Sequence, residues 1–191
     1  MKFGTIKLAG QPCLVMQHNS GGMCRVDRLL ATANADSVAT MLDLVRSVDE
    51  DPALATALSA AAGSIDVQHI LLEDDQTEWL PPIGNPSKIL GVAFNNRELM
   101  KKAHYDPGVP NFFLKPPSCL IGHGKPIIVD PNWGAVIPEP EICAVIGRRA
   151  KHIVEADALD YVFGFMIHND VTSHGLKFGK DSIAVTYDRD M

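Results

Sequence analysis

The first 78 residues carry the pattern of a small domain that mixes strands and helices. Short apolar runs predict strands, and apolar residues spaced three to four apart predict amphipathic helices. The predicted strands cover residues 2–8, 13–17 and 67–73, with a hairpin or meander over 23–30, and the predicted helices cover 37–48 and 52–62. Asp36 or Ser37 is the expected N-cap of the first helix.

A segment dense in proline and glycine, residues 79–87, predicts a linker, and the pattern changes after it. Short β-branched strands then alternate with proline-rich loops, which favours a β-rich α+β architecture over a doubly wound parallel sheet. The predicted strands are 88–94, 126–129, 142–146 and 165–167, the helices 96–104 and 157–163, and the extended loop 112–118. The predicted domains are therefore residues 1–78 and 88–191, joined by the linker 79–87.

Composition narrows the class of protein. The formal net charge of the 191 residues is −6, which argues against a nucleic-acid partner because phosphate binding needs an excess of Lys and Arg. The four cysteines show no C-x-x-C spacing, so free thiols in a reducing compartment are expected. No apolar run approaches membrane-spanning length and the N-terminus does not resemble a signal peptide, so we expect a cytoplasmic protein without membrane contact.

Two glutamates that lie two residues apart are the most informative evidence for a functional site in the sequence. Glu139 and Glu141 precede and begin an apolar strand, so their side chains should lie on one face, about 6–7 Å apart. Carboxylates that share a space repel unless a cation intervenes, and oxygen-only ligands select a hard ion such as Mg²⁺, Mn²⁺ or Ca²⁺. An ordinary pair of surface glutamates has the same spacing, so the pattern leaves both readings open.

Other candidates are single residues. Asp170 ends an apolar strand, where a carboxylate can project into a site or simply form a turn. Lys115 lies in an apolar and proline-rich stretch, an unusual place for a solubilising charge. Arg97 and His104 lie on or beside the short helix after residues 88–94 and have an alternative role as exposed helix surface. Nucleophile-elbow, P-loop and dinucleotide fingerprints do not occur in the sequence.

Five segments in order resemble the fumarylacetoacetate hydrolase family. They are residues 91–95 (GVAFN), 113–122 (FLKPPSCLIG), 139–148 (EPEICAVIGR), 158–164 (ALDYVFG) and 169–172 (NDVT). The resemblance is good over residues 88–172, and the N-terminal region is similar to the family's small leading domain. It implies a mixed β-roll catalytic domain, of which residues 88–191 would be the first part only.

The resemblance also implies a metal site and a reaction. By match, Glu139, Glu141 and Asp170 would hold Mg²⁺, Mn²⁺ or Ca²⁺, and the metal would stabilise enolate charge on a small oxo or diketo acid. The expected activity is hydrolysis of a C–C bond in an acylpyruvate-like 2,4-diketo acid in catabolism. Arg97 and Lys115 would supply positive charge for the substrate carboxylate. A homodimer is the assembly that the family likeness suggests.

The family's general base is missing from its usual position. The family segment commonly reads N-Y-x-x-H-x-x-E, and here Leu99 and Lys102 occupy the histidine and glutamate positions. His104 could substitute only if the chain folds back there. Decarboxylation, tautomerisation or double-bond isomerisation of a 2-oxo acid, which need the metal enolate but not that base, are therefore the alternative activities. A further alternative is a catalytically incomplete fragment or oligomer partner, since little after Asp170 matches the family's closing segments.

Overall fold

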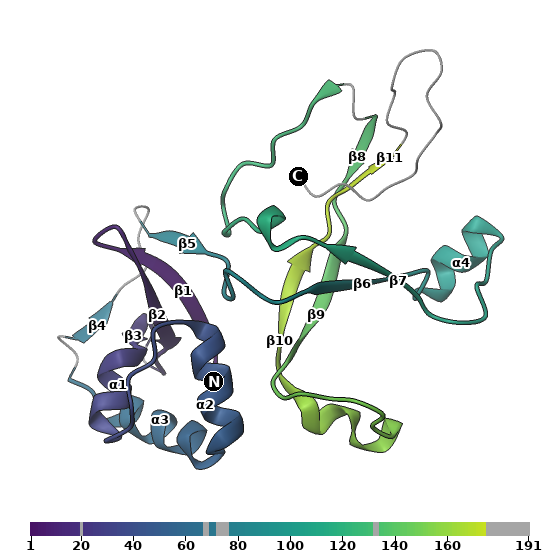
Figure 1. Ribbon diagram of the computed structural model, residues 1–191. Helices are drawn as coiled ribbons and strands as arrows, with labels where there is room; N and C mark the ends of the chain where they lie inside the picture. The colour runs from purple at the N-terminus through teal and green to yellow at the C-terminus, as the bar shows by residue number, and fades with distance from the viewer. Residues whose placement is uncertain (20, 67–68, 72–76, 132–133, 175–191) are drawn as a thin grey trace.

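The computed structural model describes residues 1–174 apart from residues 20, 67–68, 72–76 and 132–133. An N-terminal region, residues 1–80, holds one antiparallel sheet with three helices beside it (Figure 1). A C-terminal region, residues 89–174, holds three two-stranded ladders. The fold is α+β and rich in strands, as predicted.

Five strands form the N-terminal sheet in the order β4-β3-β2-β1-β5. They are β1 (Phe3–Leu8), β2 (Gln11–Gln17), β3 (Met23–Arg25), β4 (Ile70–Leu71) and β5 (Glu78–Leu80). Ala9 and Gly10 connect β1 to β2 with φ values of 50° and 81°. Two positive φ angles in a two-residue connection match the twist of the flanking strands, which explains the tight hairpin there. β5 pairs with β1, so this sheet extends two residues into the predicted linker.

Three helices follow or interrupt the strands of this region: α1 (Val26–Thr32), α2 (Met41–Glu50) and α3 (Ala53–Ser64). The N-cap of α2 is Thr40, not Asp36 or Ser37 as predicted. The Thr40 hydroxyl accepts a hydrogen bond from the backbone N–H of Asp43, and the Asp43 carboxylate accepts one from the backbone N–H of Thr40. This reciprocal pair satisfies two donors that a helix start otherwise leaves open, which fixes the first turn at residue 41.

The main apolar core lies between these helices and the sheet. Leu29, Leu44 and Leu58 from the three helices are fully buried and pack against Met16 and Cys24 of the sheet. Burial of side chains of this size contributes roughly 1.5–3 kcal/mol each. The N-terminal region therefore has an apolar core made of its own helices and sheet.

The C-terminal region is built from three antiparallel ladders: β6 (Ile89–Ala93) with β7 (Asn111–Lys115), β8 (Ala135–Ile137) with β11 (Thr172–His174), and β9 (Pro140–Ile146) with β10 (Val162–Asn169). Helix α4 (Arg97–Ala103) connects β6 to β7, and the 3₁₀ helices η2 (Pro117–Cys119) and η4 (Glu155–Tyr161) follow β7 and precede β10. Figure 1 shows the β6–β7 hairpin crossing the β9–β10 hairpin, with α4 at its far end.

Several local predictions are wrong. Residues 112–118 were expected as a loop, but β7 runs to Lys115 because residues 111–115 pair in register with β6. Residues 126–129 form no strand, and residues 23–30 divide into β3 and the start of α1. The short strands β8 and β11 were not predicted. No helix within the described residues is both long and apolar enough to cross a membrane.

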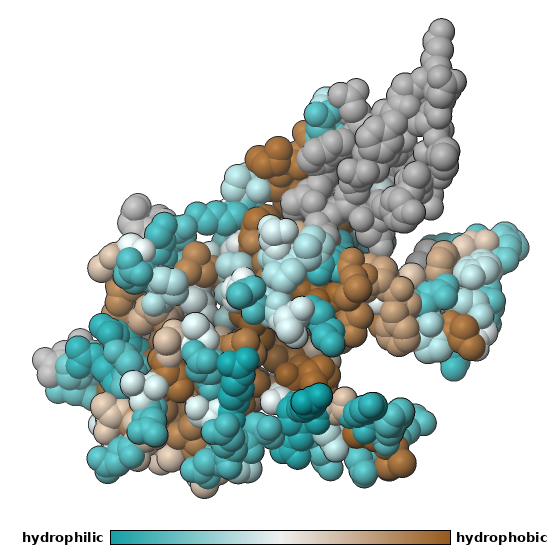
Figure 2. Space-filling model, viewed as in Figure 1, coloured by the Kyte–Doolittle hydropathy of each residue, from teal (hydrophilic) through white to brown (hydrophobic). Residues whose placement is uncertain are grey.

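Large apolar side chains of the C-terminal region are exposed on its strands. On β9 and β10, Ile142 is 81% and Ile167 is 84% exposed, and these two residues face each other in the ladder. Phe165 on β10 and Phe112 and Leu114 on β7 are also more than 60% exposed. Figure 2 shows hydrophobic residues at the surface in the middle of the view, over these strands. Every second residue of β7, β9 and β10 thus faces outward, and these residues form an apolar surface that includes Phe112, Leu114, Ile142, Phe165 and Ile167.

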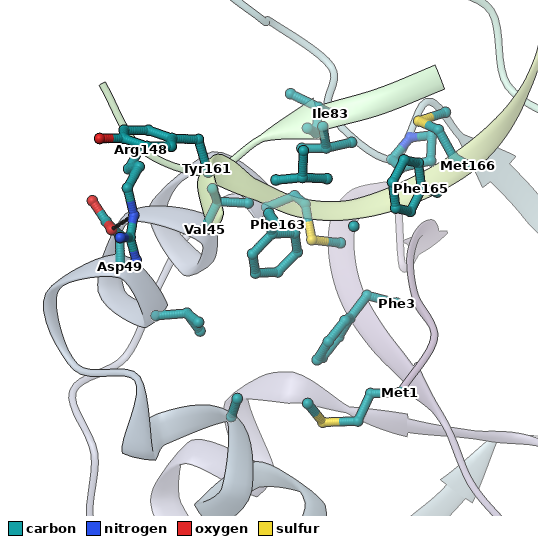
Figure 3. Close-up of a pocket in the computed structure, with 18 of the residues that line it drawn as sticks. Met1, Phe3, Val45, Asp49, Ile83, Arg148, Tyr161, Phe163, Phe165 and Met166 are labelled. Atoms are coloured by element: carbon teal, nitrogen blue, oxygen red, sulfur yellow. Dashed lines mark ion pairs between the residues drawn. The ribbon is translucent and has the colours of Figure 1, made fainter. Parts of the chain in front are cut away.

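The two regions meet across a cavity of about 570 Å³ (Figure 3). At one end Arg148 pairs with Asp49 at 2.9 Å and lies 5.6 Å from the centre of the Tyr161 ring. Toward the other end, the rings of Phe3 and Phe163 approach each other with their centroids 6.4 Å apart. Helix α2 is thus joined by an ion pair to the segment that follows β9, and β1 contacts β10 through two aromatic rings.

Candidate functional site

The ends of four strands bring Lys115, Glu139 and Asp170 to one place. Lys115 is the last residue of β7 and is paired in register with Ile89. Glu139 directly precedes β9, and Asn169, the last residue of β10, pairs with Pro140. Asp170 follows at once, and Thr172 begins β11. Pairing between the strands fixes the backbone at their ends, so the positions from which these side chains project are also fixed.

Lys115 and Asp170 form a buried ion pair. The ammonium of Lys115 contacts Oδ1 of Asp170, and the two side chains are only 5% and 4% exposed. The Lys115 ammonium also lies 5.9 Å from the centre of the Phe113 ring, which is on the same face of β7. Charges removed from water are costly unless they are paired, so each of these residues depends on the other.

Glu139 is held by the segment that carries Asp170. Its backbone N–H donates to Oδ1 of Asn169 at 3.0 Å, and its carbonyl accepts from the backbone N–H of Asp170 at 2.8 Å. Its carboxylate oxygen Oε2 accepts a hydrogen bond from the hydroxyl of Thr172, also at 2.8 Å. Two of the three predicted metal ligands, Glu139 and Asp170, are therefore joined through a single network.

Glu141 lies two residues further along β9 and is half-buried, as is Glu139. Its cross-strand neighbour is His168. Burial raises the pKa of the Cys143 thiol, and the negative charge of Glu141 raises it further. Over the part of the chain that the structure describes, no three His, Cys, Asp or Glu side chains are grouped so that they could hold one metal ion. The oxygen donors of Glu139 and Asp170, which the network above joins, are of the kind that suits a hard divalent cation.

A cavity of about 640 Å³ lies beside the ion pair. Lys115, His168 and Asn169 contribute to its wall from the strands, and Trp79 and Gly122 contribute from β5 and the loop after η2. A Cβ atom on Gly122 would overlap the Trp79 carbonyl oxygen, so only glycine allows the loop to approach β5 this closely. The cavity has the size of a small-molecule site and a buried cation at its wall.

The structure does not bring Arg97 and His104 to this cluster. Both are exposed, Arg97 at the start of α4 and His104 just after its end. Helix α4 joins the hairpin where Ala93 pairs with Asn111, whereas Lys115 is at the opposite end of β7. Four residues of strand separate the two ends by roughly 13 Å. Glu98 at the first turn of α4 pairs with Lys101, also on the surface.

The sequence argument missed the contributions of Thr172 and Asn169. Thr172 is 3% exposed, and its hydroxyl contacts Glu139 across 33 residues of sequence. A polar residue two positions after a strand-end acid was the available signal. The signal could not identify the partner, because β8 and β11, which place Thr172, were not predicted.

Comparison with known proteins places these observations in a family. The family model described as fumarylacetoacetate (FAA) hydrolase C-terminal matches residues 88–189. The Pyrococcus horikoshii protein PH0643 is 38% identical over 93 residues, which cover 48% of this chain and 40% of that protein. The mitochondrial oxaloacetate tautomerase Fahd2a of Rattus norvegicus is 33% identical over 119 residues, or 62% of this chain and 38% of the tautomerase.

A solved structure shares the fold. The crystal structure of maleylpyruvate hydrolase from Sphingobium sp. SYK-6, in complex with manganese(II) and pyruvate, aligns with a TM-score of 0.69 and 24% identity. The alignment covers 92% of this chain and 60% of the hydrolase. The chain thus spans about two fifths of the curated relatives that it matches and a larger part of the solved structure. Because the family model matches more than half of its residues, the chain belongs to the fumarylacetoacetate hydrolase family.

Proposed function

We propose that this chain carries the metal-binding part of an enzyme that acts on a small 2-oxo or 2,4-diketo acid. The proposed ligands of the divalent metal are Glu139, Glu141 and Asp170. The observation that supports them most is the buried network in which Thr172 and the 169–172 backbone hold Glu139 next to the Lys115–Asp170 pair. Glu141 completes the proposed set because it lies two residues after Glu139, at the start of β9.

The donor chemistry supports a hard ion. Carboxylate oxygens suit Mg²⁺, Mn²⁺ or Ca²⁺ better than softer metals, and the Sphingobium hydrolase was solved with manganese(II). That hydrolase also holds pyruvate, a 2-oxo acid. A bound divalent ion would act as a Lewis acid that stabilises negative charge building on the oxygens of the substrate.

The residues of the chain supply binding and orientation. Lys115 is paired with Asp170 and lies in the wall of the 640 Å³ cavity, and in this proposal its ammonium also contacts the carboxylate of an acid that enters there. A buried ammonium attracts a carboxylate more strongly than an exposed one because the surroundings screen it less. Lys115 would thus orient the substrate carboxylate beside the three acidic residues. Arg97, the second substrate contact proposed from the sequence, lies on α4 at the opposite end of the β6–β7 hairpin and would reach the substrate only if α4 moved toward the cavity.

Two reactions fit this site. Hydrolysis of a C–C bond in an acylpyruvate-like acid is the first, and it requires a general base. The base proposed from the sequence, His104, is exposed after α4 and lies away from the acidic residues. Keto–enol tautomerisation of a 2-oxo acid is the second, with decarboxylation and isomerisation related to it. The second is favoured by Leu99 at the position of the family histidine and by the rat relative, which is named an oxaloacetate tautomerase.

A substrate panel with and without Mg²⁺ or Mn²⁺ tests the proposal. Pyruvate together with a second carboxylate indicates hydrolysis, whereas a change in enol absorbance without cleavage indicates tautomerisation. The variant Glu141→Ala should lose the metal-dependent activity, and Glu155→Ala, which removes an exposed glutamate of η4, should keep it. Equal metal-dependent activity in both variants would contradict the ligand assignment. Metal binding without turnover would instead support the catalytically incomplete alternative.

The assembly and the location are part of the same proposal. We expect a homodimer in the cytoplasm, and the apolar surface of β7, β9 and β10 supports contact with a second copy. Native mass spectrometry of the protein in buffer distinguishes one copy from two. A monomer at micromolar concentration would contradict the dimer.

A further inference from the structure

Thr172 is a buried hydroxyl directed at an acidic side chain. It is 3% exposed, and its Oγ1 lies 2.8 Å from Oε2 of Glu139 and 3.3 Å from the carbonyl oxygen of Asp170. A hydroxyl has one proton to donate, and the shorter contact, to a carboxylate, is the stronger hydrogen bond. The geometry therefore assigns the proton of Thr172 to Glu139.

The backbone around Glu139 is fixed independently of this bond. Asn169 accepts its N–H and the N–H of Asp170 donates to its carbonyl, so both peptide groups of Glu139 are tied to the segment that carries Asp170. What these bonds leave variable is the direction of the glutamate side chain, which has three rotatable torsions. The hydroxyl of Thr172 is the group that fixes this direction.

We infer that Thr172 is a positioning residue that aims the Glu139 carboxylate toward the metal held in the proposed site. The inference rests on the proposed function, since a carboxylate needs aiming only where it binds something. Thr172 and Asp170 lie two residues apart on the same segment, so one segment carries one proposed ligand and orients another. Outer groups that orient a metal ligand typically change metal affinity 10–100-fold when they are removed.

Matched variants separate the hydroxyl from the shape of the side chain. Thr172→Val keeps the shape and removes the donor, Thr172→Ser keeps the donor, and Thr172→Ala is a second variant without the hydroxyl. Thr5→Val is the control, because Thr5 is also a buried threonine whose hydroxyl donates a hydrogen bond, to the carbonyl of Pro82 at 2.9 Å. Mn²⁺ affinity of the full chain, measured by electron paramagnetic resonance, is the readout, with thermal unfolding followed in parallel.

We expect Thr172→Val and Thr172→Ala to bind Mn²⁺ about 10–100-fold more weakly, while Thr172→Ser and Thr5→Val remain close to the parent. Parent-like affinity in both hydroxyl-free variants would overturn the inference and leave the metal site intact. Loss in Thr172→Ser or in Thr5→Val would also overturn it, because the effect would then not follow the hydroxyl at this position. A parent chain that does not bind Mn²⁺ would refute the proposed metal site itself, and the inference with it.

Discussion

The two regions of the molecule bury different kinds of side chain. Within the described residues, every buried apolar side chain except Val171 lies before residue 63. The buried polar residues follow the opposite distribution: Thr5 belongs to the N-terminal region, whereas Lys115, Asp170, Thr172 and Ser173 belong to the C-terminal region. Large exposed apolar side chains, Met1 aside, lie there as well.

This difference separates the apolar core from the candidate site along the chain. The N-terminal region is held by the burial of leucine, valine and methionine side chains, which is non-directional and tolerates small shifts. What is buried in the C-terminal region is mostly the candidate site, which is held by an ion pair and hydrogen bonds with specific directions. A substitution at the site should therefore affect the local stability of the C-terminal region as well as its chemistry.

The largest expected effect is at the ion pair. Lys115→Met leaves the Asp170 carboxylate buried without its cation, which typically costs about 3–5 kcal/mol. The matched control is Lys101→Met, which breaks an exposed pair with Glu98 and should cost less than about 1 kcal/mol. Hydrogen exchange of the β10 amides reports the local stability directly.

A second variant tests whether the lost stability comes from the unpaired charge or only from the changed shape of the side chain. Replacing both partners, as Lys115→Met with Asp170→Leu, removes the unpaired charge and should recover most of the lost protection. Equal protection in Lys115→Met and in the parent would show that the pair does not stabilise the C-terminal region.

The apolar side chains give the next largest contrast. Leu58→Ala removes a fully buried side chain of α3 and should lower the free energy of unfolding by about 2–5 kcal/mol. Ile167→Ala changes a side chain that is 84% exposed, so it should cost less than about 0.5 kcal/mol. Urea unfolding of the two variants measures both values. A large cost for Ile167→Ala would mean that this apolar surface is covered in solution, and the dimer would then be the first explanation to test.

Regular elements were more predictable from the sequence than their pairing. Helix α3 and strands β1, β2, β6, β9 and β10 follow apolar periodicity, and their core segments were correctly placed. The short strands β8 and β11 have three residues each, too few to show a period, and they form only because they pair with each other. The N-cap of α2 was missed because several residues before the helix can cap it, and only the Thr40–Asp43 pair satisfies both backbone donors.

The candidate site was predictable in its acids and not in their partners. Glu139 and Glu141 were selected from their spacing, Asp170 from its place at the end of a strand, and all three from the family resemblance, whereas Lys115 was selected because a lysine is unusual in an apolar and proline-rich stretch. The Lys115–Asp170 contact joins residues 55 apart in sequence, and such a contact depends on how the hairpins cross. Arg97 and His104 were selected from their position near β6, yet the length of the hairpin separates them from the acids.

The smallest expected effect concerns the junction between the regions, where Glu78 of β5 accepts a hydrogen bond from Lys125 at 2.7 Å and pairs with Lys7 at 3.4 Å. The hydrogen bond from Lys125 is the main reason that the pKa of Glu78 lies below its ordinary 4.5, with Lys7 acting in the same direction. The folded state therefore holds the charged form more strongly than the unfolded state does. The resulting stability is present above the ordinary pKa and disappears as the pH falls through the lowered one.

Glu78→Gln should consequently be slightly less stable than the parent near neutral pH, and the difference should vanish in acid. Because the side chain is one third exposed, added salt should reduce the difference as well. Thermal unfolding of both proteins from neutral pH to below pH 4.5, the ordinary pKa of Glu78, provides the measurement. Glu155→Gln, which changes an exposed glutamate outside the junction, is the comparison. A difference that persists unchanged into acid would mean that Glu78 acts through packing, and the junction would then resemble the apolar N-terminal region rather than the polar C-terminal site.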